Sequence, residues 1–266
     1  MSATDTGKPY RAVLTGASGG IGAAIAERLA PRCALLIVVG RKRDALEALA
    51  QRLPGCPVLI VDGDLCEPAT AHRVADLARA SGGINLLINN AGVSSFHAFD
   101  TQAPEAIRAQ VETNLIAPML LTRELLPLLG LAPAAQVINI GSVFGALGFP
   151  GFAAYGAAKA GLAGFSQSLR RELADTSIAV RHFSPRATRT PINSAAVNGM
   201  NRELRTNEDT PEAVADAFMK FLAGSAAERT LGGSERFFVL VNKLLPGIPE
   251  SAIRKQLTQI RKYLPR

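Results

Sequence analysis

The sequence has little charge, few cysteines and no long apolar run. Charged residues make up 19% of the 266 residues and hydrophobic residues 48%, against roughly 25% charged in typical soluble proteins. This composition excludes a disordered chain and predicts a packed core. No apolar stretch approaches the ~20 residues that span a bilayer, and the first residues show no basic-then-apolar signal pattern. We therefore expect a cytoplasmic protein.

Cysteine and histidine are also too few and too scattered for a metal site. These residues show no metal-ligand spacing: Cys33, Cys56, Cys66, His72, His97 and His182. In the cytosol the three cysteines would stay reduced as thiols. No metal is expected. The net charge of +7 is uneven, because residues 243–266 hold six basic residues and one acid. The near-neutral remainder argues against nucleic-acid binding.

Short apolar runs alternate with helix-like segments along the chain. The runs lie at residues 11–15, 34–40, 58–62, 84–89, 137–140 and 178–183, and the helix-like segments at 21–30, 43–53, 68–80, 104–129 and 152–175. Strands that are apolar throughout are buried on both faces, as in a parallel sheet between two layers of helices. The pattern predicts an α/β fold, a doubly wound parallel sheet of Rossmann type.

We expect one such domain over residues 1–233 and a helical extension of it over 234–266. Residues 183–210 read as a long irregular segment, and the last strand is expected near 229–231. The apolar residues at 237–245 follow the spacing of a helix face rather than of a strand.

A glycine-rich turn follows the first predicted strand. Gly16 supplies backbone freedom for a tight turn, Gly20 leaves room for a pyrophosphate, and Gly22 lets the next helix pack on the strand. A phosphate would then lie at the N-terminus of that helix. A tight turn without a ligand is the alternative.

The residues after the second and third predicted strands bear on the choice of dinucleotide. Arg41 stands where NAD-binding proteins usually place an acid for the ribose. A guanidinium matches a 2′-phosphate, which favours NADP, although residues 41–43 could also be a solvated helix start. Asp64 could accept an adenine amino group, but alone it indicates no more than a turn.

Several polar residues recur in a fixed order further along. Asn90, Ala91 and Gly92 follow the fourth predicted strand, Asn114 lies within a helix, Ser142 follows the fifth strand, and Tyr155 precedes Lys159 by four residues. Together with the glycine-rich turn, this order and the Ser-to-Tyr spacing resemble the short-chain dehydrogenase/reductase family over roughly residues 11–191. The sequence around Ser142 lacks the G-x-S-x-G elbow of a hydrolase.

Tyr155 and Lys159 make chemical sense without the resemblance. Residues four apart share a helix face, so both side chains point into one cleft. A cation ~4 Å from a phenolate can lower the pKa of the phenol by up to ~3 units. Tyr155 can then act as a general acid or base, and Ser142 can hydrogen-bond a substrate carbonyl. Each residue alone could equally be an ordinary core or surface group.

The resemblance implies further roles. It makes Asn114, Ser142, Tyr155 and Lys159 the catalytic set, with Asn114 holding a water and Lys159 also binding the ribose. It implies cofactor contacts from Gly16, Ser18, Gly20, Ile21, Gly22, Arg41, Asp64, Leu65, Asn90, Ala91, Gly92, Tyr155, Lys159, Pro185, Thr188 and Thr190. Arg186 departs from the family, which usually has glycine there. We expect this arginine to be solvated or, alternatively, to meet an acidic group of the cofactor or substrate.

The sequence thus predicts an NADP-dependent reductase that interconverts a ketone and a secondary alcohol on an apolar or acyl-chain substrate. Residues expected to frame the cleft, or else to be ordinary core, are Phe96, Phe144, Phe149, Phe152 and Met200. A 3-oxoacyl carrier-protein reductase and a non-catalytic dinucleotide-sensing regulator are the alternatives. The intact Ser142, Tyr155 and Lys159 argue against the regulator.

The predicted C-terminal helix at residues 249–264 is amphipathic and cationic. Ile253, Leu257, Ile260 and Leu264 form one stripe between basic residues. The stripe could dock on the protein itself or on a partner subunit, lie on the inner face of an anionic membrane, or receive an acidic carrier protein. The resemblance also implies a homodimer or homotetramer through the helices at 104–129 and 152–175, where small residues at 156–164 permit close contact.

Overall fold

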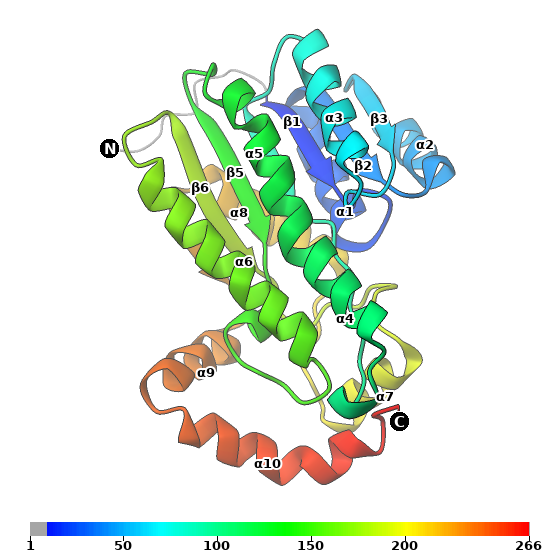
Figure 1. Cartoon of the computed structure of the whole chain (residues 1–266), viewed down its shortest axis with the longest axis vertical. Helices are drawn as coiled ribbons and strands as arrows, with labels where there is room; N and C mark the ends of the chain where they lie inside the picture. Colours follow the sequence, from blue (N-terminus) through cyan, green and yellow to red (C-terminus); the bar gives the residue numbers. More distant parts are fainter. Residues whose placement is uncertain (1–9, 266) are drawn as a thin grey trace.

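The computed structural model describes residues 10–265, which form one parallel sheet with helices on both faces (Figure 1). Its strand order is β3-β2-β1-β4-β5-β6-β7. The strands are β1 Tyr10–Thr15, β2 Cys33–Gly40, β3 Val58–Asp62, β4 Leu86–Asn89, β5 Ala135–Ile140, β6 Ile178–Ser184 and β7 Glu228–Thr230. Every neighbouring pair is parallel, so the predicted doubly wound sheet is confirmed.

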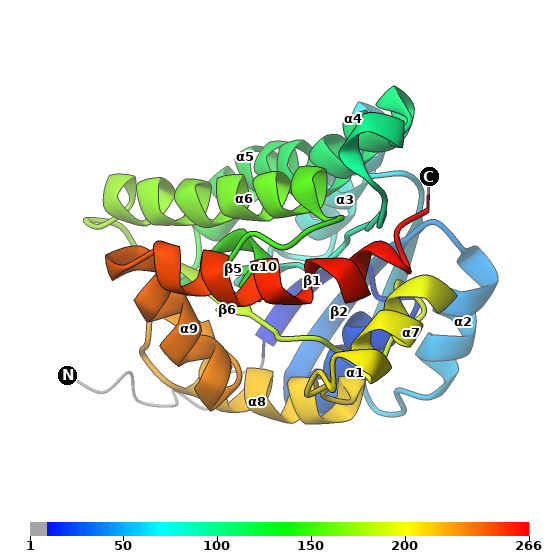
Figure 2. The same cartoon turned by 90° about the horizontal axis from the view of Figure 1, so that it is seen from below.

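The helices cover the sheet in two layers, each with its own core. They are α1 Gly20–Leu29, α2 Arg43–Gln51, α3 Pro68–Ala80, α4 Pro104–Val111, α5 Ala117–Leu129, α6 Ala153–Glu172, α7 Ala195–Glu203, α8 Pro211–Ala223, α9 Gly233–Leu244 and α10 Gly247–Arg261. Apolar side chains of α1, α2 and α8 pack on one face, and those of α3, α5 and α6 on the other. Figure 2 shows α5 and α6 on one side of the sheet and α1 and α8 on the other. No helix within residues 10–265 is long and apolar enough to cross a membrane.

The central strands are apolar throughout because both of their faces are covered. Leu36 and Val38 of β2 point into the core beneath α1, and Ile37 and Val39 point into the core beneath α3. All four side chains are fully buried. The near-continuous apolar run that predicted this strand is therefore a direct consequence of its position between two helical layers.

The segment predicted to be irregular contains a helix, so that prediction is wrong in part. Ser194 accepts a hydrogen bond from the backbone N–H of Val197 at 3.3 Å and begins α7. Val197 and Met200 of α7 are buried against the C-terminal segment. The helix was missed because its sequence carries few apolar residues and a mid-helix glycine, so tertiary packing overrides a weak local preference.

The predictions for the C-terminal end are confirmed. The last strand lies at Glu228–Thr230, one residue from its expected place, and residues 237–245 are helical except at the final position. Helix α10 runs across the carboxyl end of the sheet (Figure 2). Ile260 is fully buried there, and Ile253 and Leu264 pack beside it, so the amphipathic stripe docks on the protein itself. Arg266, at the end of the basic tail, lies outside the described residues.

Candidate active site

The carboxyl ends of β1, β4, β5 and β6 form the edge at which the predicted polar residues meet. Strand β1 pairs with β2 on one side and with β4 on the other, so the chain reverses direction across the sheet at this point. Ligands of open parallel sheets bind in the crevice outside such a reversal. The glycine-rich turn, Asn90, Ser142 and Pro185 all follow strands that end here.

The glycine-rich turn is held by the segment after β4. Gly16 and Gly20 have φ angles of 64° and 54°, in the left-handed region that favours glycine. A side chain on Gly16 would place its Cβ 2.7 Å from Cα of Ala91. The Asn90 amide donates to the carbonyls of Thr15 at 3.0 Å and Gly16 at 3.2 Å. Asn90 therefore fixes the turn.

Two further contacts complete this turn. The Thr15 hydroxyl accepts hydrogen bonds from the N–H groups of Asn90 at 2.9 Å and Ala91 at 3.0 Å. A Cβ on Gly22 would collide with the carbonyl oxygen of Gly16, so only glycine lets α1 begin this close to β1. Ile21 lies at the start of the helix and packs partly on the core beneath α1.

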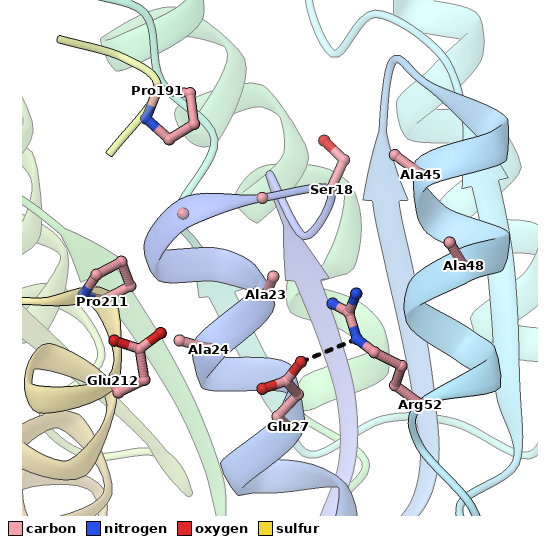
Figure 3. Close-up of a pocket in the computed structure, with 12 residues that line it drawn as sticks. Ser18, Ala23, Ala24, Glu27, Ala45, Ala48, Arg52, Pro191, Pro211 and Glu212 are labelled. Atoms are coloured by element: carbon pink, nitrogen blue, oxygen red, sulfur yellow. Dashed lines mark hydrogen bonds and ion pairs between the residues drawn. The ribbon is translucent and has the colours of Figure 1, made fainter. Parts of the chain in front are cut away.

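A pocket of about 430 Å³ opens beside the turn, between α1, α2 and the start of α8 (Figure 3). Ser18 and Gly20 line it, together with Pro191 from the loop after β6. Figure 3 shows that the Glu27–Arg52 ion pair, with an N–O distance of 3.1 Å, lines the same pocket. Of the predicted cofactor residues, this pocket thus gathers Ser18 and Gly20, and Arg41 and Asp64 lie outside it.

Arg41 and Arg43 differ in their partners. Arg43 donates to Glu47 at 2.8 Å and to Asp62 at 3.2 Å, whereas exposed Arg41 has no hydrogen bond or ion pair within residues 10–265. Arg41 is therefore available to an anion at the end of β2. Asp64 is exposed and uses one carboxylate oxygen to accept the N–H of Cys66 at 2.9 Å.

Leu65, the other residue predicted after β3, is half-buried. Its side chain packs on the core beneath α3. A contact from Leu65 to a ligand would therefore come from its backbone.

Ser142, Tyr155 and Lys159 come together between β5 and α6. The Lys159 ammonium lies 5.9 Å from the centroid of the Tyr155 ring and donates to the carbonyl of Ile140 at 2.9 Å. The Ser142 hydroxyl accepts the N–H of Phe144 at 3.2 Å and lies close enough to the Tyr155 phenol to lower the pKa of that phenol. Lys159 is 5% exposed, so its charge acts in a poorly solvated place.

Burial dominates the acid–base properties of this group. It raises the pKa of the Tyr155 phenol, which the Ser142 hydrogen bond lowers in part. Burial lowers the pKa of Lys159 to about 8. The expected lowering of the Tyr155 pKa by Lys159 is thus not the dominant effect in this structure, because the ammonium is directed at Ile140 rather than at the phenol oxygen.

Asn114 lies in a π-helical turn, Glu112–Ile116, that joins α4 to α5. The single helix predicted over 104–129 is therefore interrupted at the candidate site, where π-bulges are often found. The fully buried Asn114 amide donates to the carbonyl of Val93 at 2.8 Å and accepts its N–H at 3.0 Å. A Cβ on Gly92 would lie 2.8 Å from the Asn114 carbonyl oxygen and 3.7 Å from the Lys159 nitrogen, so glycine is required there.

The loop after β6 is held from within the protein. Thr188 is buried, its hydroxyl donates to the carbonyl of Arg186 at 2.9 Å, and its own carbonyl accepts the Asn193 amide at 2.9 Å. The Thr190 side chain lies 3.2 Å from where a Cβ on Gly20 would stand, so this loop meets the glycine-rich turn. The carbonyl of buried Pro185 accepts the N–H of Val143 at 3.2 Å.

Arg186 is not simply solvated, as first expected, because acidic side chains of the protein itself pair with it. Its guanidinium makes two hydrogen bonds to Asp209, at 3.0 and 2.7 Å, and lies 3.7 Å from Glu235 at the start of α9. The side chain is 23% exposed. Arg186 thus ties the loop after β6 to the C-terminal segment through its own acidic partners.

A chain of buried polar groups runs beneath the site and was not expected. Asn89, Asn139 and His182 are aligned on the adjacent strands β4, β5 and β6. Asn89 donates to Asn139 at 2.8 Å, Asn139 donates to the Ser166 hydroxyl at 2.9 Å, and Ser166 lies 3.3 Å from the His182 ring nitrogen. Burial, together with the charge of Lys159, lowers the pKa of His182 to about 4, so this histidine is neutral near pH 7. The signal that could have found it is a polar residue near the carboxyl end of each of these apolar strands.

Apolar side chains gather next to Tyr155. We call this group the aromatic cluster: Phe96, Phe144, Phe149, Phe152, Val197, Met200 and Ile260. The Phe152 ring lies 6.2 Å from the Tyr155 ring, centroid to centroid. A pocket of about 230 Å³ lies between the cluster and the first turns of α6. The five residues expected to frame the cleft therefore lie together, and α10 covers them.

The described residues contain no group of side chains able to hold a metal ion. The chain matches the family model for short chain dehydrogenases over residues 11–201. It is 35% identical over 187 residues to the 3-oxoacyl-(acyl-carrier-protein) reductase FabG of Escherichia coli strain K12, covering 69% of this chain and 75% of that protein.

Solved structures agree with this match. A short-chain dehydrogenase from Burkholderia cenocepacia J2315 in complex with NADP has a TM-score of 0.76 and 27% identity, covering 85% of this chain and 98% of that one. Another, from Sphingobium yanoikuyae in complex with NADPH, has a TM-score of 0.75 and 31% identity, covering 90% and 95%. The sequence match, the sheet order and the site geometry agree, and the chain is an oxidoreductase of the short-chain dehydrogenase family.

Proposed function

We propose that this protein is an NADP-dependent reductase that converts a ketone on an apolar or acyl-chain substrate into a secondary alcohol. One observation supports this most: the Tyr155 side chain lies near both Ser142 and the buried Lys159 and borders the aromatic cluster. A proton donor, a carbonyl-binding hydroxyl and an apolar surface therefore meet at one place.

Tyr155 is the proposed proton donor. As a carbonyl is reduced, its oxygen gains negative charge and takes the proton from the Tyr155 hydroxyl, while Ser142 holds that oxygen by a hydrogen bond. The positive charge of Lys159 stabilises the tyrosinate left behind. Since the Lys159 pKa is about 8, this support is strongest below pH 8. Asn114 holds the backbone at Val93, which keeps Gly92 beside the Lys159 nitrogen.

The residues present are suited to a dinucleotide phosphate. Gly16 and Gly20 leave backbone exposed at the N-terminus of α1, and Arg41 offers a guanidinium that has no partner among residues 10–265. We propose that the cofactor is held by Gly16, Ser18, Gly20, Ile21, Gly22, Arg41, Asp64, Leu65, Asn90, Ala91, Gly92, Tyr155, Lys159, Pro185, Thr188 and Thr190. When bound, the nicotinamide supplies a hydride to the carbonyl carbon.

The substrate is proposed to be apolar because the aromatic cluster borders Tyr155. A 3-oxoacyl chain on a carrier protein is a second candidate, supported by the 35% identity to the Escherichia coli reductase that carries this name. Basic residues on the outer side of α10, such as Arg254 and Lys255, would suit an acidic carrier.

We also propose a cytoplasmic homodimer or homotetramer. Ile116, at the end of the π-helical turn, is 42% exposed, and Met119 and Leu120 at the start of α5 are 38% and 48% exposed. The small residues of α6 lie nearby in the same layer of helices. Light scattering at micromolar concentration tests this assembly, and a monomer would contradict it.

Turnover of NADPH with a panel of ketones tests the proposed function. We expect loss of NADPH absorbance with long-chain or aromatic ketones, and little with acetone. A preference for 3-oxoacyl carrier-protein thioesters over free ketones would favour the second candidate. Tight NADPH binding with no turnover of any member of the panel would instead support the dinucleotide-sensing regulator.

A further inference from the structure

Helix α9 exposes apolar side chains along most of its length. No residue of α9, which lies wholly in the described part of the chain, is fully buried. The exposed apolar residues of α9, of the turn after it and of the start of α10, with the exposed fraction of each, are Phe237 62%, Phe238 41%, Leu240 55%, Leu244 70%, Leu245 59% and Ile248 53%. We call this set the α9 face. It is the longest run of exposed large apolar residues among residues 10–265.

The orientation of α9 is fixed, so the apolar residues cannot turn inward. The Asn242 amide donates to the carbonyl of Ala146 at 3.0 Å, and Glu235 meets Arg186 at 3.7 Å. These two residues are seven apart and share one side of the helix. Phe237, Leu240 and Leu244 are spaced by three and four residues and share the other side.

Cationic side chains flank the α9 face. Arg236 and Lys243 each precede an exposed apolar residue by one position, so they lie about a quarter turn around the same helix. Arg254 and Lys255 of α10 are also exposed and have no ion pair or hydrogen bond within residues 10–265. Between residues 233 and 265 the acidic side chains are Glu235, which is held by Arg186, and exposed Glu250. Glu228 of β7 also lies within electrostatic range of Lys243, and Arg170 pairs with it at 2.7 Å.

We propose that the α9 face binds an anionic membrane surface, with its apolar side chains among the lipid headgroups and acyl chains and its cations on the lipid phosphates. Helices that combine an exposed apolar stripe with flanking Lys and Arg lie in the plane of such surfaces. The docked stripe of α10 cannot serve this role, since Ile260 is buried against the protein.

A second copy of the chain fits the α9 face less well. A two-fold contact places the same patch on both sides, so Arg236 and Lys243 would face a patch that carries the same cations. A carrier protein would satisfy the cations but would leave Phe237, Leu240 and Leu244 without a reason to be exposed together. A lipid surface satisfies both groups.

Vesicle sedimentation of the full-length protein tests this proposal. We expect binding to vesicles of phosphatidylglycerol and phosphatidylcholine in equal parts. Binding to vesicles of phosphatidylcholine alone should be weaker by at least roughly tenfold. The combined variant Phe237→Ser, Leu240→Ser, Leu244→Ser should lose binding to both. Leu131→Ser is the matched control, because Leu131 is 82% exposed and precedes β5, at the opposite end of the sheet.

A charge variant separates the two contributions. Arg236→Gln with Lys243→Gln should weaken binding to the anionic vesicles roughly tenfold or more while preserving the weak binding to phosphatidylcholine. The melting temperature of each variant reports whether it is folded. Failure of the native protein to bind anionic vesicles would overturn the proposal, as would unchanged binding by the folded apolar variant. A native dimer that the apolar variant converts to a monomer would overturn it in favour of a second copy.

Discussion

Helices α6 and α9 use their side chains in opposite ways. Helix α6 buries six residues, including Lys159 from the candidate site, whereas α9 buries none within the described structure. Contacts from β5, β6 and the π-helical turn surround α6, so its polar groups have fixed partners. Only a few polar contacts hold α9, and its outer face is left for another surface. The candidate catalytic residues therefore lie in the densely packed layer around α6, and the proposed membrane contact lies at the periphery.

Removal of the Tyr155 hydroxyl tests whether α6 carries the proton donor. Tyr155→Phe should lower kcat by roughly 10² to 10⁴ while the Kd for NADPH changes little, because only the proton donor is lost. Tyr263→Phe is the control, since that phenol donates to Glu203 at 2.8 Å on the surface. Steady-state kinetics and NADPH fluorescence measure the two effects. Near-normal turnover by Tyr155→Phe would exclude this residue as the acid.

Two truncations of aliphatic side chains compare how tightly α9 and α10 pack on the protein. Ile260→Ala removes a fully buried side chain from the aromatic cluster and should lower the free energy of unfolding by about 2–4 kcal/mol. Leu244→Ala removes a side chain that is 70% exposed and should change it by less than about 0.5 kcal/mol. Urea unfolding measures both. Equal losses would mean that α9 is packed as tightly as α10.

Acid should destabilise the polar chain beneath α6. The pKa of His182 falls from 6.5 to about 4 on folding, so the unfolded chain binds more protons between these values and stability falls as pH drops through them. This residue accounts for about 3 kcal/mol of the loss between pH 7 and pH 4. The variant His182→Gln should show that much less pH dependence in urea unfolding. An unchanged pH profile would show that His182 has the same pKa in the folded and the unfolded chain.

Removal of the Arg41 guanidinium should have a smaller effect, on the choice of dinucleotide. Arg41→Ala should raise the Kd for NADPH roughly ten- to hundredfold, the value of a charge-assisted hydrogen bond, and leave the Kd for NADH nearly unchanged. Arg43→Ala should have a minor effect, because Arg43 is held by Glu47 and Asp62. Fluorescence titration with both dinucleotides measures these changes. Equal losses for NADPH and NADH would place Arg41 away from the 2′-phosphate.

Local sequence patterns predicted the sheet and much of the site. The apolar runs located the strands because β1, β2, β4 and β5 are covered on both faces. Spacing located Tyr155 and Lys159 because four residues make about one turn of helix, and the structure brings both beside Ser142.

Other features depend on contacts distant in sequence. Arg186 meets Asp209 and Glu235, which follow it by 23 and 49 residues, and no local pattern indicates such partners. The π-helical turn at Asn114 is a change of backbone hydrogen bonding that leaves the residue pattern of a helix intact. The direction of the Lys159 ammonium, toward Ile140, likewise depends on where β5 ends.

We propose that one part of the chain holds the cofactor and that another part completes the substrate site. NADPH binding and ketone reduction, measured together in a chain that ends at Gly247, test this division. Without α10 the aromatic cluster loses Ile260 and its cover, while the glycine-rich turn and Arg41 are untouched. We predict an unchanged Kd for NADPH and a KM for a long-chain ketone raised roughly tenfold or more. An unchanged KM, or loss of NADPH binding by a folded truncated chain, would contradict this division.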